Sequence, residues 1–211
     1  MFRIWGRASS VNAQKVLWAL EELGVPFERI DAGGKYGVTD SAEYAAMNPT
    51  RRVPVIKDGD LVLWESDAIL RYLAAREGKL YPEGLAARAR ADQWMAFSAT
   101  GMQPHFIKLF WQLVRFPPDK RDAVAEAAAR ADLAKALVIL NDALAGQEWL
   151  TGEEFGIADI APGSLMHRIE ALGLIPEDAP ALKAWAARLA ERPGYARHVA
   201  TSFEELRAPG A

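Results

Sequence analysis

The chain has 211 residues, of which 51% are hydrophobic and 25% charged, and its formal net charge is −3. This balance is typical of a folded globular protein, and the interspersed basic and acidic residues argue against nucleic acid as a partner. The absence of cysteine excludes disulfides, thiolate metal sites and a protein thiol as nucleophile. No secretory signal and no apolar stretch of membrane-spanning length is visible, so we expect a cytoplasmic protein without membrane contacts.

The first elements predict a βαβ unit. Phe2 to Trp5 is a short apolar strand, and the cluster Ser9-Ser10-Val11-Asn12 can cap a following helix. Helical spacing of apolar residues continues until Gly24. Phe27 to Ile30 alternates apolar and charged residues and predicts a second strand. Strand, helix and strand at this spacing predict a parallel pair with a right-handed crossover.

The next segment completes a small mixed domain. Asp40 with Glu43 forms a candidate capping box for a short helix. Val53 to Ile56 and Leu61 to Trp64 flank an Asp-Gly turn, which predicts a hairpin. Ser66 then caps a third helix. The order β-α-β-α-β-β-α predicts a thioredoxin-like plan, an α+β fold, over residues 1–78.

Residues 79–86 are interpreted as a linker, and residues 87–211 have helical periodicity throughout, which predicts an all-helical bundle domain. Pro117-Pro118 is expected to start the helix that carries the clearest apolar stripe. That stripe consists of Leu133, Leu137, Leu140 and Leu144.

Ser10 and Asn12 lie where the first strand meets the first helix. The N–H groups and dipole of a helix start favour an anion there. A hydroxyl at this point can donate to a bound thiolate and lower its pKa, although serine itself is too weak an acid to be the base. The alternative is that these residues only cap the helix.

Val53-Pro54 is unusual because proline removes a hydrogen-bond donor from a strand. A cis bond here would leave the Val53 backbone free to pair with an extended peptide ligand. The alternative is an edge-strand proline without a ligand.

Glu65-Ser66 begins the third helix. A hydroxyl at a helix start suits a carboxylate, and Glu65 suits an ammonium group, so the pair suits an amino-acid head group. Simple capping is again the alternative.

Taken in order, the Ser10-Val11-Asn12 turn, the Arg52-Val53-Pro54 strand and the Glu65-Ser66 cap resemble the glutathione site of the glutathione transferase family. The resemblance extends over the chain, including Leu80-Tyr81-Pro82 in the linker and Gly156-Ile157-Ala158-Asp159 in the second domain. The S-x-N start resembles the serine-type classes, theta and phi, and their bacterial relatives. The family resemblance implies glutathione as co-substrate, no metal, and a homodimer.

The resemblance also implies residue roles. Ser10 would donate to the glutathione sulfur with support from Asn12, and the Val53 backbone beside Pro54 would pair with the cysteinyl unit. Glu65 and Ser66 would hold the γ-glutamyl end. Arg52 and Lys35 would reach the ligand backbone and the glycyl carboxylate, or remain solvated surface charges.

The chain departs from the family pattern in two places. Trp5 stands where the tyrosine-type classes place their tyrosine, and Gly156 stands where a Ser or Thr helix cap is common. Asp159 can still accept a backbone hydrogen bond from Gly156, so we expect this change to affect stability and not activity.

The electrophile site is expected between the domains, along the fourth helix. Its candidates, which could instead be core residues, are Met102, His105, Phe106, Phe110 and Trp111. His105 has no metal-ligand spacing to the other histidines.

The main hypothesis is transfer of the glutathione thiolate to an apolar electrophile. One alternative keeps glutathione but reduces peroxides or disulfides. Another is a binding protein with the same fold and no turnover.

Overall fold

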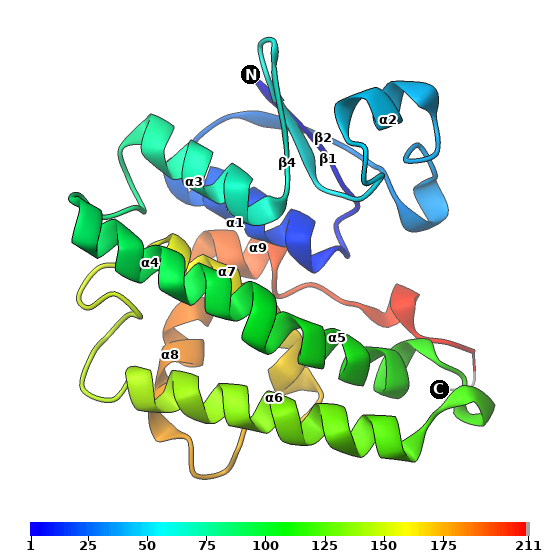
Figure 1. The fold of residues 1–211 in the computed structure, drawn as a ribbon, viewed down its shortest axis with the longest axis vertical. Helices are drawn as coiled ribbons and strands as arrows, with labels where there is room; N and C mark the ends of the chain where they lie inside the picture. Colours follow the sequence, from blue (N-terminus) through cyan, green and yellow to red (C-terminus); the bar gives the residue numbers. More distant parts are fainter. Residues whose placement is uncertain (210–211) are drawn as a thin grey trace.

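The computed structural model describes residues 1–209. A mixed αβ unit comes first and a helical unit follows, packed against it (Figure 1). This arrangement confirms the predicted fold class.

The first unit is built on one four-stranded mixed sheet with the order β2-β1-β3-β4. β1 pairs in parallel with β2 and antiparallel with β3, which pairs antiparallel with β4. The strands are β1 (Phe2–Trp5), β2 (Phe27–Ile30), β3 (Val55–Asp58) and β4 (Leu61–Trp64). The βαβ crossover and the hairpin are confirmed, but β3 begins two residues later than predicted because Val53 and Pro54 form a bend before it.

Helices cover both faces of the sheet. α1 (Val11–Leu23) and α3 (Ser66–Glu77) share one apolar cluster with β1 and β3. On the other face, Tyr44 of α2 (Ala42–Met47) is buried against Val55. The first turn of α1 and the bend before β3 are thereby held at one edge of the unit.

Two predicted caps are corrected. Ser41, not Asp40, caps α2, because its hydroxyl accepts the N–H of Tyr44 at 3.1 Å. Glu65, not Ser66, is the capping residue of α3, and Ser66 is the first residue inside the helix. Glu65 adopts φ 68°, a conformation uncommon outside glycine, and this turns the chain sharply from β4 into α3.

The second unit consists of helices around one apolar core. They are α4 (Leu85–Phe97), α5 (Gln103–Phe110), α6 (Ala123–Ala143), α7 (Ile157–Ala171), α8 (Pro180–Ala190) and α9 (Pro193–His198). α4 and α5 belong to one long run, with wider π turns at Ser98–Met102 and Trp111–Arg115. α4 starts at Leu85, inside the predicted linker.

The leucine stripe of α6 is buried as predicted, but the helix does not start at Pro117-Pro118. Pro118–Lys120 forms a separate 3₁₀ turn. Asp122 caps α6, its carboxylate accepting the N–H groups of Val124 and Ala125 at 2.9 and 3.0 Å. An aspartate side chain can accept these N–H groups, whereas proline has no side-chain acceptor.

The start of α7 joins the linker to the helical core. Asp159, which is fully buried, accepts the N–H of Gly156 at 3.1 Å, as expected. It also accepts from Leu150 N–H at 3.0 Å and Trp185 Nε1 at 2.9 Å. A Cβ on Gly156 would lie 2.6 Å from the carbonyl oxygen of Leu80. The approach of the linker therefore leaves no room for a serine or threonine cap.

Candidate functional site

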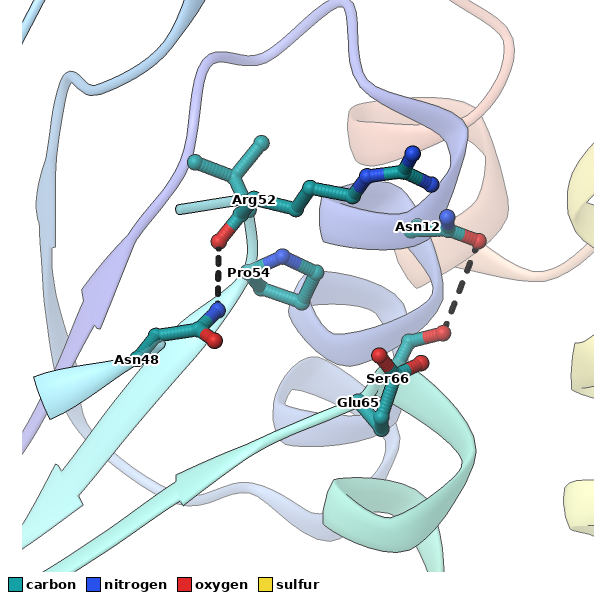
Figure 2. A pocket seen from close by; sticks show the side chains of 7 residues that line it. Asn12, Asn48, Arg52, Pro54, Glu65 and Ser66 are labelled. Carbon is teal, nitrogen blue, oxygen red and sulfur yellow. Dashed lines mark hydrogen bonds between the residues drawn. The ribbon is translucent and has the colours of Figure 1, made fainter. Parts of the chain in front are cut away.

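A cavity of about 70 Å³ opens at the edge of the first unit, between the start of α1, the bend before β3 and the start of α3 (Figure 2). It is lined by Asn12, Asn48, Arg52, Val53, Pro54, Glu65 and Ser66. Six of these seven residues were predicted from the sequence as site residues. Segments far apart in the chain therefore meet here, as the motif order predicted.

Hydrogen bonds from two side chains of the first unit fix the bend before β3. The Val53-Pro54 peptide bond is cis, and the carbonyl of Arg52 accepts hydrogen bonds from Tyr44 Oη and Asn48 Nδ2, both at 2.8 Å. Within residues 1–209, neither the N–H nor the C=O of Val53 has a hydrogen-bond partner. The Val53 backbone is thus available to pair with an extended peptide.

The opposite wall is the start of α3. Glu65 is exposed at its rim, and the Ser66 hydroxyl is buried and lies 3.5 Å from Asn12 Oδ1. A carboxylate beside a helix start offers a partner for an ammonium group and N–H donors for an anion. This wall can therefore hold both charges of an amino-acid head group.

Ser10 is placed differently from Asn12. Ser10 caps α1, its hydroxyl accepting the N–H of Ala13 at a long 3.4 Å, and the residue is only 8% exposed. Asn12 lines the cavity, whereas Ser10 does not. Since the bond to Ala13 uses a lone pair, the Ser10 O–H proton is still able to donate.

Lys35 and Arg52 are both surface cations, but only Arg52 lines the cavity. The Lys35 ammonium forms an ion pair with Glu205 in the C-terminal segment and does not line the cavity. Glu205 in turn raises the pKa of Lys35 by this hydrogen bond. Arg52 is exposed on the cavity wall. Only Arg52 is thus placed to reach a ligand directly.

Three of the electrophile-site candidates are core residues. Met102 and Phe106 are 0% and 1% exposed inside the helical core. Phe110 is also buried, with its ring 5.6 Å from that of Phe203. Helical spacing places these side chains on the face that packs against α6 and α7, so Met102 and Phe106 present no surface to a ligand.

The other two candidates lie outside the buried core, His105 partly buried and Trp111 exposed. The imidazole Nδ1 of His105 lies 3.6 Å from Asp132 of α6, which places it at the α5–α6 contact. Trp111 is 40% exposed and is covered by the guanidinium of Arg115, 4.7 Å from its ring centre. Trp111 is the only one of the five candidates with a large exposed apolar surface.

Three arginines, Arg7, Arg115 and Arg168, lie near one another, and the last two contact the rings of Trp111 and Phe110. Arg168 of α7 is buried, donates to the carbonyl of Ser9 at 2.8 Å, and stacks 5.2 Å from the Phe110 ring. Burial, together with the charges of Arg7 and Arg115, lowers the pKa of Arg168 to about 10. In the part of the chain that the structure describes, none of these three guanidinium groups forms an ion pair within 4.0 Å.

Sequence reasoning missed three polar residues of the site. Asn48 was not singled out as a site residue, although its two amide ends form hydrogen bonds with Arg52 and Thr50. Lys15 and Gln103 are linked to Asn12 through hydrogen bonds. A lysine among the apolar residues of the first helix was the one signal available for this network.

Within residues 1–209, no cluster of three or more His, Asp or Glu side chains is arranged to bind a metal ion. No helix in the same range has the length and apolar character required to cross a membrane.

Comparison with known families agrees with this geometry. Residues 1–75 match the family model for the glutathione S-transferase N-terminal domain, and residues 102–193 match that for the C-terminal domain. Glutathione S-transferase GstB of Escherichia coli K12 is 38% identical over 203 residues, covering 94% of this chain and 98% of the relative. Glutathione S-transferase theta-3 of Mus musculus is 37% identical over 178 residues, covering 79% and 72%.

Among solved structures, the theta class glutathione S-transferase of Xanthomonas axonopodis pv. citri with glutathione bound superposes with a TM-score of 0.89 at 42% identity. The match covers 95% of this chain and 98% of that one. The cavity geometry, both domain matches and these relatives agree: the chain belongs to the glutathione S-transferase family.

Proposed function

We propose that this glutathione transferase binds glutathione as an extended peptide in the cavity between α1, the bend before β3 and α3. The unpaired backbone of Val53 pairs with the cysteinyl unit, and Glu65 with Ser66 holds the γ-glutamyl end. The observation that carries this proposal is the meeting of Asn12, Val53 and Ser66 around one cavity. Arg52 reaches the ligand from the wall. Lys35 contacts the glycyl carboxylate only by leaving Glu205.

The chemistry is activation of the glutathione thiol. At the start of α1, the Ser10 hydroxyl and the Asn12 amide donate hydrogen bonds to the sulfur, and the helix dipole favours its negative charge. The thiol proton leaves to solvent. The thiolate then forms a bond to an electrophilic carbon, whose leaving group departs with its electron pair. Holding both reactants together supplies the rest of the rate enhancement.

The test is the thiol pKa of bound glutathione, followed by the ultraviolet absorbance of the thiolate. Free cysteine thiols titrate near pH 8.5, and we expect a lower value in the wild-type complex. Ser10→Ala and Asn12→Ala should each raise it by about one unit, since each removes one donor. Unchanged values in both variants would refute the assigned roles. Absence of glutathione binding by calorimetry would instead favour a binding protein without turnover.

For the second substrate, we propose an apolar electrophile beside Trp111 and the edge of Phe110. The arginine cluster favours one that also carries a negative charge. Arg7, Arg115 and Arg168 lie close together and form no ion pair within 4.0 Å in residues 1–209, although the nearby carboxylate of Glu205 partly offsets the charge of Arg7. Guanidinium groups beside aromatic rings suit a carboxylate with an apolar body.

Two matched substrates test this preference. 4-(Chloromethyl)benzoate and benzyl chloride share the reacting carbon and differ in the carboxylate. We expect a higher kcat/KM for the charged substrate, and Arg7→Met should remove the preference while leaving benzyl chloride turnover near wild type. Equal kcat/KM values for the wild-type enzyme would show that the cluster does not select the substrate.

Reduction of peroxides or disulfides with glutathione is the second candidate, because glutathione supplies the sulfur for it too. Comparing turnover of an organic peroxide with that of a chloro-aromatic substrate separates the two reactions. The homodimer remains part of the proposal and is tested by light scattering after size exclusion. The cytoplasmic location is tested by cell fractionation.

A further inference from the structure

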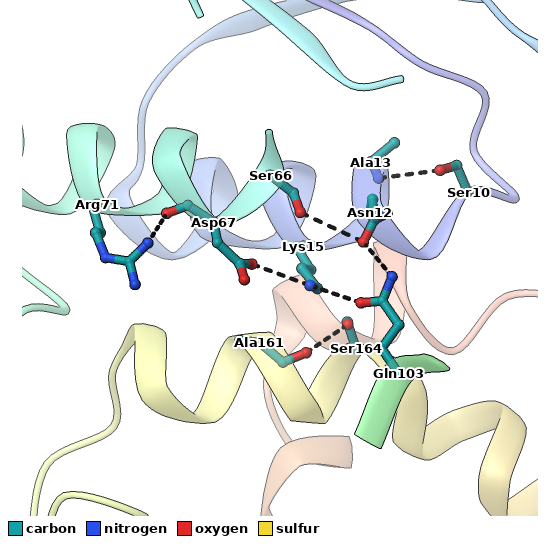
Figure 3. A network of polar contacts seen from close by, with 10 residues as sticks. All are labelled: Ser10, Asn12, Ala13, Lys15, Ser66, Asp67, Arg71, Gln103, Ala161 and Ser164. Atoms are coloured by element: carbon teal, nitrogen blue, oxygen red, sulfur yellow. Dashed lines mark hydrogen bonds and ion pairs between the residues drawn. The ribbon is translucent and has the colours of Figure 1, made fainter. Parts of the chain in front are cut away.

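The ammonium group of Lys15 is buried between the two units. Its side chain is 1% exposed, although lysine is almost never fully buried without a partner. It donates to Asp67 Oδ1 and to Gln103 Oε1, both at 3.1 Å (Figure 3). An ammonium group has three donors and no acceptor. Only the oxygen end of the Gln103 amide can therefore face Lys15.

This orientation determines the next residue. With its oxygen on Lys15, Gln103 turns its nitrogen to Asn12 and donates to Asn12 Oδ1 at 3.1 Å. The Ser66 hydroxyl lies 3.5 Å from the same oxygen. Figure 2 shows the nitrogen end of Asn12 directed away from Ser66. Within residues 1–209, this nitrogen donates no hydrogen bond, so its two N–H groups are available to a ligand in the cavity.

We propose that Lys15, acting through Gln103, is a positioning residue that fixes the Asn12 amide with its N–H donors toward the glutathione sulfur. This inference rests on the proposed function. An asparagine amide has a donor end and an acceptor end of nearly the same shape. Only the donor end stabilises a thiolate, whereas the acceptor end repels it and raises the thiol pKa.

The direction of the relay depends on the positive charge of Lys15. A neutral amide in its place could donate or accept, and then both orientations of Gln103 and Asn12 would be possible. Lysine allows one orientation only. Asp67 compensates the buried charge from α3, with its side chain 18% exposed, so the relay joins α1, α3 and α5.

A double-mutant cycle on the thiol pKa of bound glutathione tests the relay. Gln103→Met keeps an unbranched side chain of similar length but removes both polar ends. Gln103 is half-buried, so we expect this variant to fold. Its thiol pKa should rise by about one unit, which lowers the thiolate fraction by up to about tenfold where the pH lies below both pKa values. In an Asn12→Ala background the same substitution should have no effect, because the relay acts through Asn12.

Lys15→Met provides a second cycle with the same expectation. Gln147→Met, at an exposed glutamine just after the turn that follows α6, is the control that leaves the thiol pKa unchanged. Melting temperatures of all variants are measured in parallel. A purely structural role would lower the melting temperature and leave the thiol pKa as in wild type. Equal pKa shifts in the presence and absence of Asn12 would also overturn the proposal. If the wild-type protein fails to bind glutathione, the proposed function itself is wrong. This result is distinct from the failure of the relay, which is measured on a complex that does form.

Discussion

The starts of α1 and α7 both carry polar side chains close to the free N–H groups of a first helical turn, but in two different surroundings. At α7, Asp159 is fully buried and its carboxylate accepts three hydrogen bonds of 2.9 to 3.1 Å. At α1, Ser10 accepts one bond at 3.4 Å, and the side-chain nitrogen of Asn12, beside the cavity, donates no hydrogen bond to any other described residue. The acceptor at α7 is fully used inside the fold, whereas the donors at α1 remain available to a ligand.

The difference shows that a helix start can bind a ligand only where no other segment of the chain covers it. The linker carbonyl of Leu80 closes on Gly156 and seals the start of α7. At α1, the bend before β3 approaches but leaves a cavity. The following predictions test this contrast, beginning with the largest expected effect.

Asp159→Ala should lower the free energy of unfolding by about 3 kcal/mol or more, because three buried donors lose their acceptor. Urea denaturation measures this loss. Under native conditions, the thiol pKa of bound glutathione should stay at the wild-type value, since Asp159 has no contact with the cavity. A shifted thiol pKa in the folded variant would contradict the separation of the two helix starts.

The same carboxyl predicts a pH dependence. Burial raises the pKa of Asp159 to about 6 from its ordinary 3.8, against the opposing effect of its three hydrogen bonds. The folded protein therefore keeps this proton to a higher pH than the unfolded chain. The contribution to stability is fully present below about pH 4 and is lost as the pH rises through 6. Compared with Asp159→Asn, which cannot titrate, the free energy of unfolding of the wild type should fall by about 2 kcal/mol between about pH 4 and pH 6. Denaturation curves of both proteins with parallel pH profiles would contradict it.

Gly156→Ala should cost about 1 to 2 kcal/mol, because its Cβ would meet the Leu80 carbonyl oxygen at 2.6 Å and the linker would have to shift. Thermal unfolding measures the loss. Gly156 has an extended φ of −158°, so backbone strain is not the reason. Wild-type stability in this variant would mean that the linker moves freely and does not seal the start of α7.

Ser10→Ala should have the smallest effect on stability, about 0.5 kcal/mol, since its capping bond is long. Ser41→Ala is the matched control, because Ser41 caps α2 with a bond of 3.1 Å and has no proposed contact with glutathione. We expect Ser41→Ala to cost about 1 kcal/mol. A larger stability loss for Ser10→Ala than for Ser41→Ala would assign Ser10 mainly to folding.

Much of the fold could be predicted because its signals are local. The strand-helix-strand start, the Asp-Gly hairpin and the leucine stripe of α6 depend on residues close in the chain. The errors were also local and small. Ser41 replaces Asp40 as a cap and Asp122 replaces the proline pair, because several neighbouring residues can cap a helix and only the backbone geometry selects one.

The site could be predicted only in part. Asn12, Val53 and Ser66 were identified by the order of their motifs, and the cavity unites them. Met102 and Phe106 were predicted as electrophile-site residues but lie in the core. This could not be predicted, because helical spacing alone does not show which side of a helix faces solvent and which packs against another helix.

The sequence by itself determined the two-unit fold, the family and the segments that form the cavity, since each is encoded in short-range patterns. The tertiary structure alone decided how the polar groups are partnered. Lys15 faces Gln103 across the two units, Gln103 then orients Asn12, and Leu80 closes on Gly156. Such pairings join residues up to 91 positions apart, and the direction of a hydrogen bond depends on both partners being in place.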